Sequence, residues 1–209
     1  MPSDRSRKRV ARRSRFSLYV RMSFADEEIQ LSSAPDTSVR LVLPDELDRV
    51  LPELVELLID TVHGGDPLGF LQPLAHEQAR SYWSSLRADL QTGSRLLLVA
   101  YRAHRIVGSG QLALSPWSNS PHRAELQKLF VAATFRGQGI GKALMGALHA
   151  AAAQRGRSLL VLNTRHGGAA QALYEGLGYK ESGVLPGWTL GAAGERFDHV
   201  TLYRHLPSS

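Results

Sequence analysis

One continuous segment of this chain constrains its fold more than any other, because residues 123–151 contain a strand, a glycine-rich loop and an amphipathic helix in direct succession. Arg123–Val131 alternates in polarity, which is typical of a strand with one covered face. After the loop, apolar residues recur at three- and four-residue spacing and predict a helix with one buried stripe. The stripe consists of Ile140, Ala143, Leu144, Ala147, Leu148 and Ala151. Such a unit indicates a mixed α/β domain.

The remaining elements agree with that fold class. A helix capped by Asp45 is predicted to run to Val62, with Pro52 as a candidate kink. A second helix is predicted over Ala75–Leu90 and a short one over Gly168–Leu177. Further strands are predicted at Val39–Leu43, Arg95–Arg102, Ile106–Ser115, Ser158–Asn163, Lys180–Leu190 and His199–His205. The short link between the second and third of these predicts an antiparallel hairpin.

Positive charge is concentrated at the N-terminus, which changes what the net charge of +6 implies. Residues 1–21 hold eight Arg and Lys and one Asp, whereas residues 22–209 hold 17 basic and 18 acidic residues. The nearly neutral body argues against a nucleic-acid-binding domain. We interpret residues 1–38 as a basic, solvated arm and residues 39–209 as one domain. An organelle transit peptide, a nucleic-acid-binding arm and a translation start at Met22 are the alternatives for the arm.

Composition excludes several classes of site. The chain has no cysteine, so disulfides, thiolate metal sites and cysteine nucleophiles are ruled out. This is compatible with a reducing cytosol, and we expect a cytoplasmic protein. No apolar run approaches the roughly 20 residues that cross a bilayer, so we expect no membrane partner. The histidines show no metal-ligand spacing, and we expect no metal.

The glycine-rich loop, Phe135–Lys142, has the chemistry of a phosphate site. Glycines let backbone N–H groups approach an anion, and the following helix adds the positive end of its dipole. An NTPase loop would need a glycine where Arg136 stands and a hydroxyl where Ala143 stands. A dinucleotide-binding loop would need a third glycine at Lys142 or Leu144. Both of these ligand classes are therefore excluded by spacing.

The spacing that does fit is Arg-x-x-Gly-x-Gly, formed by Arg136, Gly139 and Gly141. With this loop the chain resembles the GNAT family of acetyl-CoA-dependent N-acetyltransferases. The family also has a short helix that ends near Leu-Tyr-Glu and Gly-Tyr, matched here by Leu173-Tyr174-Glu175 and Gly178-Tyr179. The resemblance extends over residues 39–206 by order of elements. Within the family, segments 124–131, 173–179 and 183–188 look like the tabtoxin-resistance acetyltransferases.

The resemblance implies a mixed, mostly antiparallel sheet that splays at the cofactor site and has helices on both faces. It implies acetyl-CoA as the acyl donor, with the pyrophosphate on backbone amides of the loop. The loop residues concerned are Arg136, Gly137, Gln138, Gly139, Ile140, Gly141 and Lys142. The pantetheine arm would pair with the backbone of Leu129, Phe130 and Val131, and an N–H near Val131 would polarise the thioester carbonyl. Asn163 is expected to contact the pantetheine or the acceptor.

Two residues are candidates for proton transfer. Glu125 lies on the strand that leads to the loop, on the face we predict for Leu129 and Val131, and can serve as general base. The alternative for Glu125 is a surface ion pair with Arg123 or His122. The resemblance makes Tyr174 the general acid, with its hydroxyl near the CoA sulfur. The alternative for Tyr174 is a core aromatic.

The sequence therefore predicts an N-acetyltransferase that moves the acetyl group of acetyl-CoA to a primary amine of a small molecule, directly and within a ternary complex. The acceptor would be an amino-acid-like compound or an amino-group antibiotic or toxin. Candidate acceptor contacts are Trp83, Trp117 and Trp188. The alternatives are a protein or peptide N-acetyltransferase and a non-catalytic acetyl-CoA-binding regulatory module. We expect no nucleic-acid partner except through the arm, and leave open whether the chain forms a homodimer.

Overall fold

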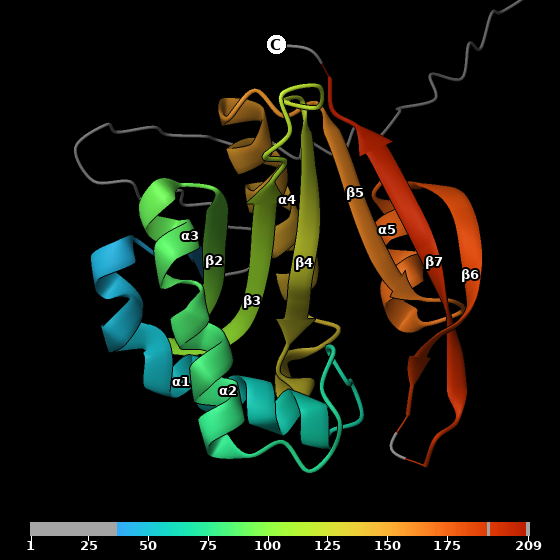
Figure 1. Ribbon diagram of the computed structural model, residues 1–209. Helices are drawn as coiled ribbons and strands as arrows, with labels where there is room; N and C mark the ends of the chain where they lie inside the picture. The colour runs from blue at the N-terminus through green and yellow to red at the C-terminus, as the bar shows by residue number, and fades with distance from the viewer. Residues whose placement is uncertain (1–36, 192, 208–209) are drawn as a thin grey trace, which may run out of the picture.

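A computed structural model describes residues 37–191 and 193–207, and Figure 1 shows that this part forms one mixed sheet with helices on both faces. The strands are β1 (Thr37–Leu41), β2 (Arg95–Arg102), β3 (Arg105–Leu114), β4 (Arg123–Val131), β5 (Leu159–Arg165), β6 (Lys180–Leu190) and β7 (Arg196–His205). Their order across the sheet is β1-β2-β3-β4-β5-β7-β6. Neighbours are antiparallel except β4 and β5, which run parallel. The predicted fold class is confirmed.

The helices divide between the two faces. They are α1 (Leu47–His63), α2 (His76–Ser85), α3 (Arg87–Thr92), α4 (Ile140–Gln154) and α5 (Ala169–Gly176), with short 3-10 turns at Pro44–Glu46 and Ala133–Phe135. Helices α1 to α3 cover β2, β3 and β4 on one face, which we call the α1–α3 face. Helices α4 and α5 pack on the opposite face, the α4 face. Figure 1 shows no described helix over the α1–α3 face of β5, β7 and β6.

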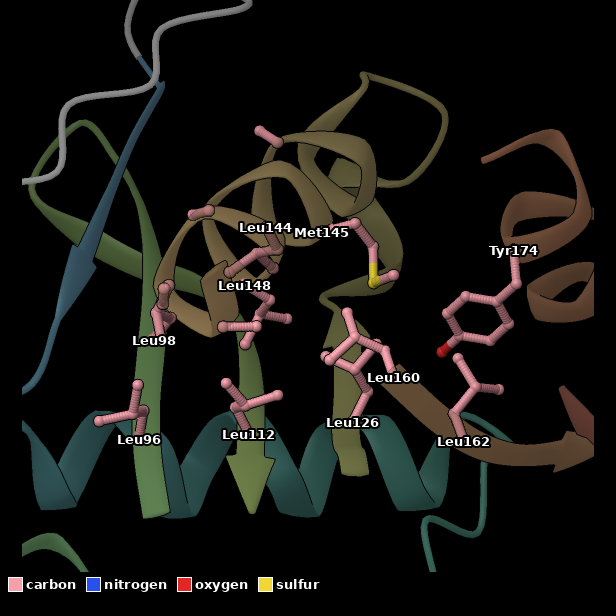
Figure 2. Packing of buried hydrophobic residues seen from close by; sticks show 14 of the residues in the cluster. Leu96, Leu98, Leu112, Leu126, Leu144, Met145, Leu148, Leu160, Leu162 and Tyr174 are labelled. Carbon is pink, nitrogen blue, oxygen red and sulfur yellow. The ribbon is translucent and has the colours of Figure 1, made fainter. Parts of the chain in front are cut away.

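The predicted stripe of α4 is confirmed, because all six of its residues are buried against the sheet. Figure 2 shows Leu144 and Leu148 of this helix above Leu98, Leu112 and Leu126 of the strands. Each fully buried leucine stabilises the fold by about 1.5–3 kcal/mol. The close approach of α4 depends on small residues in β3. A Cβ atom on Gly110 would lie 2.8 Å from Leu148 Cδ1, too close for an undisturbed contact.

Several boundaries differ from the sequence prediction; β7, for example, begins at Arg196 rather than His199, and β5 ends at Arg165 rather than Asn163. The first strand begins at Thr37 rather than Val39, and it ends at Leu41. Asp45 does not cap α1, because it lies inside the 3-10 turn Pro44–Glu46; the N-cap of α1 is Glu46, and no side chain caps it. The helix predicted over Ala75–Leu90 is divided at Leu86, whose N–H bonds to the carbonyl of Trp83 three residues earlier. A bond of that short range tightens the turn and ends an α-helix. Pro52 lies inside α1 without ending it.

The turn between β2 and β3 confirms the predicted hairpin and has an unusual backbone. Ala103 and His104 both adopt positive φ, +47° and +64°, in the left-handed region. Tight hairpins need this conformation at both central positions, and they normally place Asn and Gly there. Ala and His each adopt it at a steric cost of about 1–2 kcal/mol.

β4 contains a bulge at Lys128, which adopts a φ of +49°. The register between β3 and β4 shifts by one residue, so that Ser109 pairs with Phe130 whereas Gln111 pairs with Gln127. One extra residue in a strand reverses the faces to which the following side chains point. Before the bulge Ala124 and Leu126 face α4, and after it Leu129 and Val131 do.

Candidate active site

The site is built around an opening in the sheet. β4 and β5 pair only from Arg123 to Glu125 on one strand and from Leu159 to Val161 on the other. Beyond those residues the two strands diverge toward the end of the sheet where β4 leads into the glycine loop (Figure 1). The edge of β4 that carries Leu129, Phe130 and Val131 therefore has no partner strand in β5. A backbone edge of this kind can pair with the amides of an extended ligand.

The glycine loop follows at the end of that edge. Gly137 and Gly139 adopt positive φ, +74° and +81°, and a Cβ atom on either would meet no heavy atom within 4 Å. Gly139 is the N-cap of α4, and no side chain caps this helix end. The first N–H groups of a helix have no partner within it, so they stay available to an anion. Ile140 is buried and can offer only its backbone, whereas Lys142 is exposed in the first turn. These features fit the pyrophosphate of CoA.

Arg136 is engaged elsewhere in this structure. Its Nη2 lies 2.7 Å from Oδ2 of Asp66, and its Nε donates a hydrogen bond of 3.0 Å to the carbonyl oxygen of Val131. Asp66 belongs to the segment between α1 and α2, 70 residues away in sequence. The ion pair thus joins the cofactor loop to a segment on the α1–α3 face. We did not predict Asp66 as a site residue, and no local pattern marks it.

Because of the bulge at Lys128, the position of Glu125 relative to Leu129 and Val131 differs from the sequence prediction. Glu125 precedes the bulge and alternates with Ala124 and Leu126, which face α4, so it lies on the α1–α3 face. It therefore does not share a face with Leu129 and Val131, as the simple alternation predicted. Glu125 is half-buried, and in the described part of the chain no ion pair within 4.0 Å includes it. The predicted alternative of an ion pair with Arg123 or His122 is therefore not present.

Tyr174 lies on the other side of the opening. It is 7% exposed and belongs to the cluster under α4. Figure 2 shows its hydroxyl end directed toward Leu160 and Leu162 of β5. Burial raises the pKa of Tyr174 to about 12, so its phenol keeps its proton at any ordinary pH. The ring of Tyr179 packs edge-on against it at 5.8 Å.

A second cationic contact ties the α1–α2 segment to β4. The Nζ of Lys128 donates a hydrogen bond to the carbonyl oxygen of Leu68 and lies 5.2 Å and 5.3 Å from the ring centres of Phe70 and Tyr82. Burial, and next the charge of Arg95, lower the pKa of Lys128. The bulge places this side chain on the α1–α3 face, where the aromatic rings hold it. This contact also was missing from the sequence prediction, because it depends on the bulge.

A buried polar network lies beside Lys128 on the same face. Arg95 donates to Gln127 Oε1 at 2.6 Å and to Gln111 Oε1 at 3.0 Å. Gln111 in turn donates to the hydroxyl of Tyr82 at 2.9 Å. The network ties β2, β3 and β4 to Tyr82 of α2 on the face on which Glu125 lies.

The remaining residues predicted to contact the cofactor or the acceptor do not lie together at one site. Asn163 is exposed, and its Oδ1 accepts a hydrogen bond of 2.6 Å from Thr201 on β7. Trp188 is 56% exposed on the β6–β7 hairpin, at the same end of the sheet as the opening. Trp83 is fully buried in the core under α1 and α2, so it offers an acceptor no surface. Trp117 lies in the β3–β4 connection at the opposite end of β4, roughly 30 Å from the loop at 3.3 Å per residue.

Among residues 37–191 and 193–207, no group of three or more His, Cys, Asp or Glu side chains could hold a metal ion. No helix in the same ranges combines the length and the apolar character that crossing a bilayer requires.

Comparison with known proteins finds a family match over part of the chain and a shared fold over most of it. Residues 93–181 match the family model described as an acetyltransferase (GNAT) domain, a range that contains Glu125, the glycine loop and Tyr174. A ribosomal-protein-alanine N-acetyltransferase from Brucella melitensis is 24% identical with a TM-score of 0.66, covering 80% of this chain and 99% of that chain.

Two Salmonella typhimurium structures show the same fold. An acetyltransferase described with its cofactor acetyl-CoA is 15% identical with a TM-score of 0.65, covering 84% of this chain and 96% of that one. An acetyl transferase that modifies the N-terminal serine of a 50S ribosomal subunit protein is 18% identical with a TM-score of 0.66, covering 83% and 97%. Residues 93–181 thus match a GNAT acetyltransferase domain, and the fold around them is shared with acetyltransferase structures, which supports an acyltransferase.

Proposed function

We propose that this chain is an N-acetyltransferase that moves the acetyl group of acetyl-CoA directly to the primary amine of a small molecule within a ternary complex. The observation that carries the proposal is the placement of Glu125 and Tyr174 on opposite faces of the sheet, where β4 and β5 part. Donor and acceptor can then approach from opposite faces and meet in the opening. The backbone edge of β4 and the amides of the glycine loop hold the donor.

In the proposed reaction Glu125 takes a proton from the acceptor ammonium, directly or through water. The amine nitrogen then bonds to the thioester carbonyl carbon, the carbon–sulfur bond breaks, and the second amine proton is released. The products are the N-acetyl amine and CoA with a free thiol. A backbone N–H near Val131 polarises the carbonyl oxygen.

Tyr174 hydrogen-bonds to the sulfur as it leaves. An ordinary thiol has a pKa near 8.5, so proton transfer from a phenol with a pKa of about 12 is uphill by roughly 5 kcal/mol. The high pKa of Tyr174 keeps the hydroxyl as a permanent hydrogen-bond donor. Tyr174 therefore stabilises charge on the sulfur, and solvent supplies the proton that completes the thiol.

Two observations support a small acceptor. The segment between α1 and α2 is held on the α1–α3 face of β4, the face on which Glu125 lies, by the Asp66–Arg136 ion pair and by Lys128. Segments 124–131, 173–179 and 183–188 resemble the tabtoxin-resistance acetyltransferases, which act on a small amino compound. Trp188, at the same end of the sheet, is the candidate apolar contact, and Asn163 is the candidate polar contact.

A protein or peptide N-terminus is the second candidate acceptor. Two structural neighbours have names that specify protein acceptors, a ribosomal-protein alanine and the N-terminal serine of a ribosomal subunit protein. The α1–α3 face of β5, β7 and β6 has no described helix over it and would admit a chain end (Figure 1).

Release of free thiol from acetyl-CoA across a panel of amines tests the function. The panel contains amino acids, aminoglycosides, polyamines and short peptides with free N-termini, and mass spectrometry identifies each acetylated product. Turnover on a small amine and not on peptides supports the proposal, and the reverse result selects the protein acceptor. Tight acetyl-CoA binding with no turnover on any amine would instead identify a regulatory module.

A further inference from the structure

A pocket of about 650 Å³ lies beside the glycine loop and has no role in the reaction just described. It is lined by Ser38, Arg40, Arg49, Tyr101, Arg102, Ala103 and His104, and we call it the arginine pocket. Its walls come from β1, from α1 and from the β2–β3 hairpin. A pocket assembled from three separate elements is a feature of the tertiary fold.

The lining has the chemistry of an anion site. Among the described residues that line it, every charged side chain is an arginine and none is a carboxylate. Glu46 lies behind Arg49 at 2.6 Å and offsets part of that charge. Glu53 is occupied by the backbone N–H of Ile106, at 2.8 Å. Arginine presents a planar set of donors that matches phosphate oxygens, and it is the residue most used for this purpose.

The hairpin turn sets the position of part of the lining. Ala103 and His104 are its two central residues, and their left-handed conformations are those of a tight hairpin turn. The turn thus places Arg102 and His104 in the same pocket as Arg40 of β1 and Arg49 of α1.

Arg102 also links the pocket to the cofactor loop. Its Nη1 lies 3.3 Å from Oε1 of Gln138, which stands between Gly137 and Gly139. A ligand whose pyrophosphate lies on the loop can therefore reach the pocket with a nearby second phosphate. CoA carries such a group, a 3′-phosphate monoester on its ribose.

We propose that the arginine pocket binds a phosphate monoester. The adjacency of Arg102 to Gln138 favours the 3′-phosphate of CoA as its source, and a separate phosphorylated small molecule is the other source of the same chemistry. The assignment of the pocket to the 3′-phosphate of CoA rests on the proposed placement of the pyrophosphate at the glycine loop.

The test compares calorimetric binding of CoA and 3′-dephospho-CoA to the full chain and three variants. Arg102→Gln and Arg49→Gln remove pocket charges from two different elements. Arg105→Gln is the matched control, because Arg105 faces Arg102 across the hairpin and does not line the pocket. Far-ultraviolet circular dichroism and thermal melts confirm that each variant is folded. A second arm titrates inorganic phosphate into CoA-saturated protein and follows it by phosphorus NMR.

If the 3′-phosphate occupies the pocket, wild type and Arg105→Gln prefer CoA over 3′-dephospho-CoA by about fivefold, the upper range for an ion pair in an open site. The preference then falls toward onefold in Arg102→Gln and Arg49→Gln. If the ligand is separate, no preference is seen, but inorganic phosphate binds to the CoA-saturated wild type and not to Arg102→Gln. Equal CoA affinities together with no phosphate binding would overturn the proposal. Failure of the wild type to bind either CoA form would instead refute the proposed cofactor site. The phosphate titration, run without CoA, would then show whether the arginine pocket binds phosphate.

Discussion

His149 makes the stability of this protein depend on pH in a way that can be calculated. It lies on α4, where its Nε2 is 2.9 Å from the hydroxyl of Tyr179 and its Nδ1 is 3.4 Å from Arg204. Burial, and next the positive charge of Arg204, lower its pKa from 6.5 to about 4. Tyr179 packs against Tyr174, so the prediction also concerns the donor side of the site.

The sign and the size of the effect follow from linkage. The folded state holds the neutral imidazole, so the unfolded chain gains a proton first as the pH falls. The contribution is therefore fully present above pH 6.5 and is lost as the pH falls toward 4. Between pH 7 and pH 4.5 the two pKa values of His149 give a loss of about 2 kcal/mol in the free energy of unfolding.

Urea denaturation of wild type and His149→Gln at both pH values tests this. Other groups titrate equally in the two proteins, so the difference between them isolates His149. We expect the wild type to lose about 2 kcal/mol more than the variant on acidification. Equal losses in the two proteins would show that His149 is not held neutral by its surroundings.

Three further substitutions have defined outcomes. Asp66→Asn releases Arg136 and should tighten CoA binding by up to about fivefold, because an exposed ion pair contributes at most about 1 kcal/mol. Calorimetry that shows unchanged or weaker CoA binding would contradict this. Gly139→Ala should lower the free energy of unfolding by about 1–2 kcal/mol, because alanine is strained at this positive φ although its Cβ would meet no atom. Urea titration without cofactor measures this, and a much larger loss would show that the loop is not open at Gly139. Gly110→Ala should lower the free energy of unfolding by about 1–3 kcal/mol, because the new Cβ would clash with Leu148. In a Leu148→Ala background the loss caused by Gly110→Ala should be smaller. An equal loss in both backgrounds would exclude the clash.

Local patterns predicted much of the fold. The α4 stripe has a period of its own, and the loop between β2 and β3 is too short for anything but a hairpin, so both were predicted correctly. The glycine loop was placed correctly at the start of α4, because Gly137 and Gly139 can adopt positive φ without steric cost. These features depend on residues that are near one another in sequence.

The faces of β4 and the partners of the loop could not be predicted in that way. Lys128 forms a bulge whose side chain contacts Phe70 and Tyr82, residues that only the tertiary fold brings near it. Alternation alone therefore put Leu129 and Val131 on the same face as Glu125, although they lie on the opposite face. The ion pair between Asp66 and Arg136 joins residues 70 positions apart, and no spacing rule covers such a distance.

The division of roles between Glu125 and Tyr174 is tested most directly by steady-state kinetics on the best amine of the panel. We predict that Glu125→Gln lowers turnover by about 10²–10⁴-fold and changes the shape of the pH–rate profile, the effect expected of a lost general base. Tyr174→Phe should lower kcat, and both variants should bind CoA with wild-type affinity. A Glu125→Gln variant with the turnover and pH–rate profile of the wild type would contradict the assignment of Glu125 as the general base.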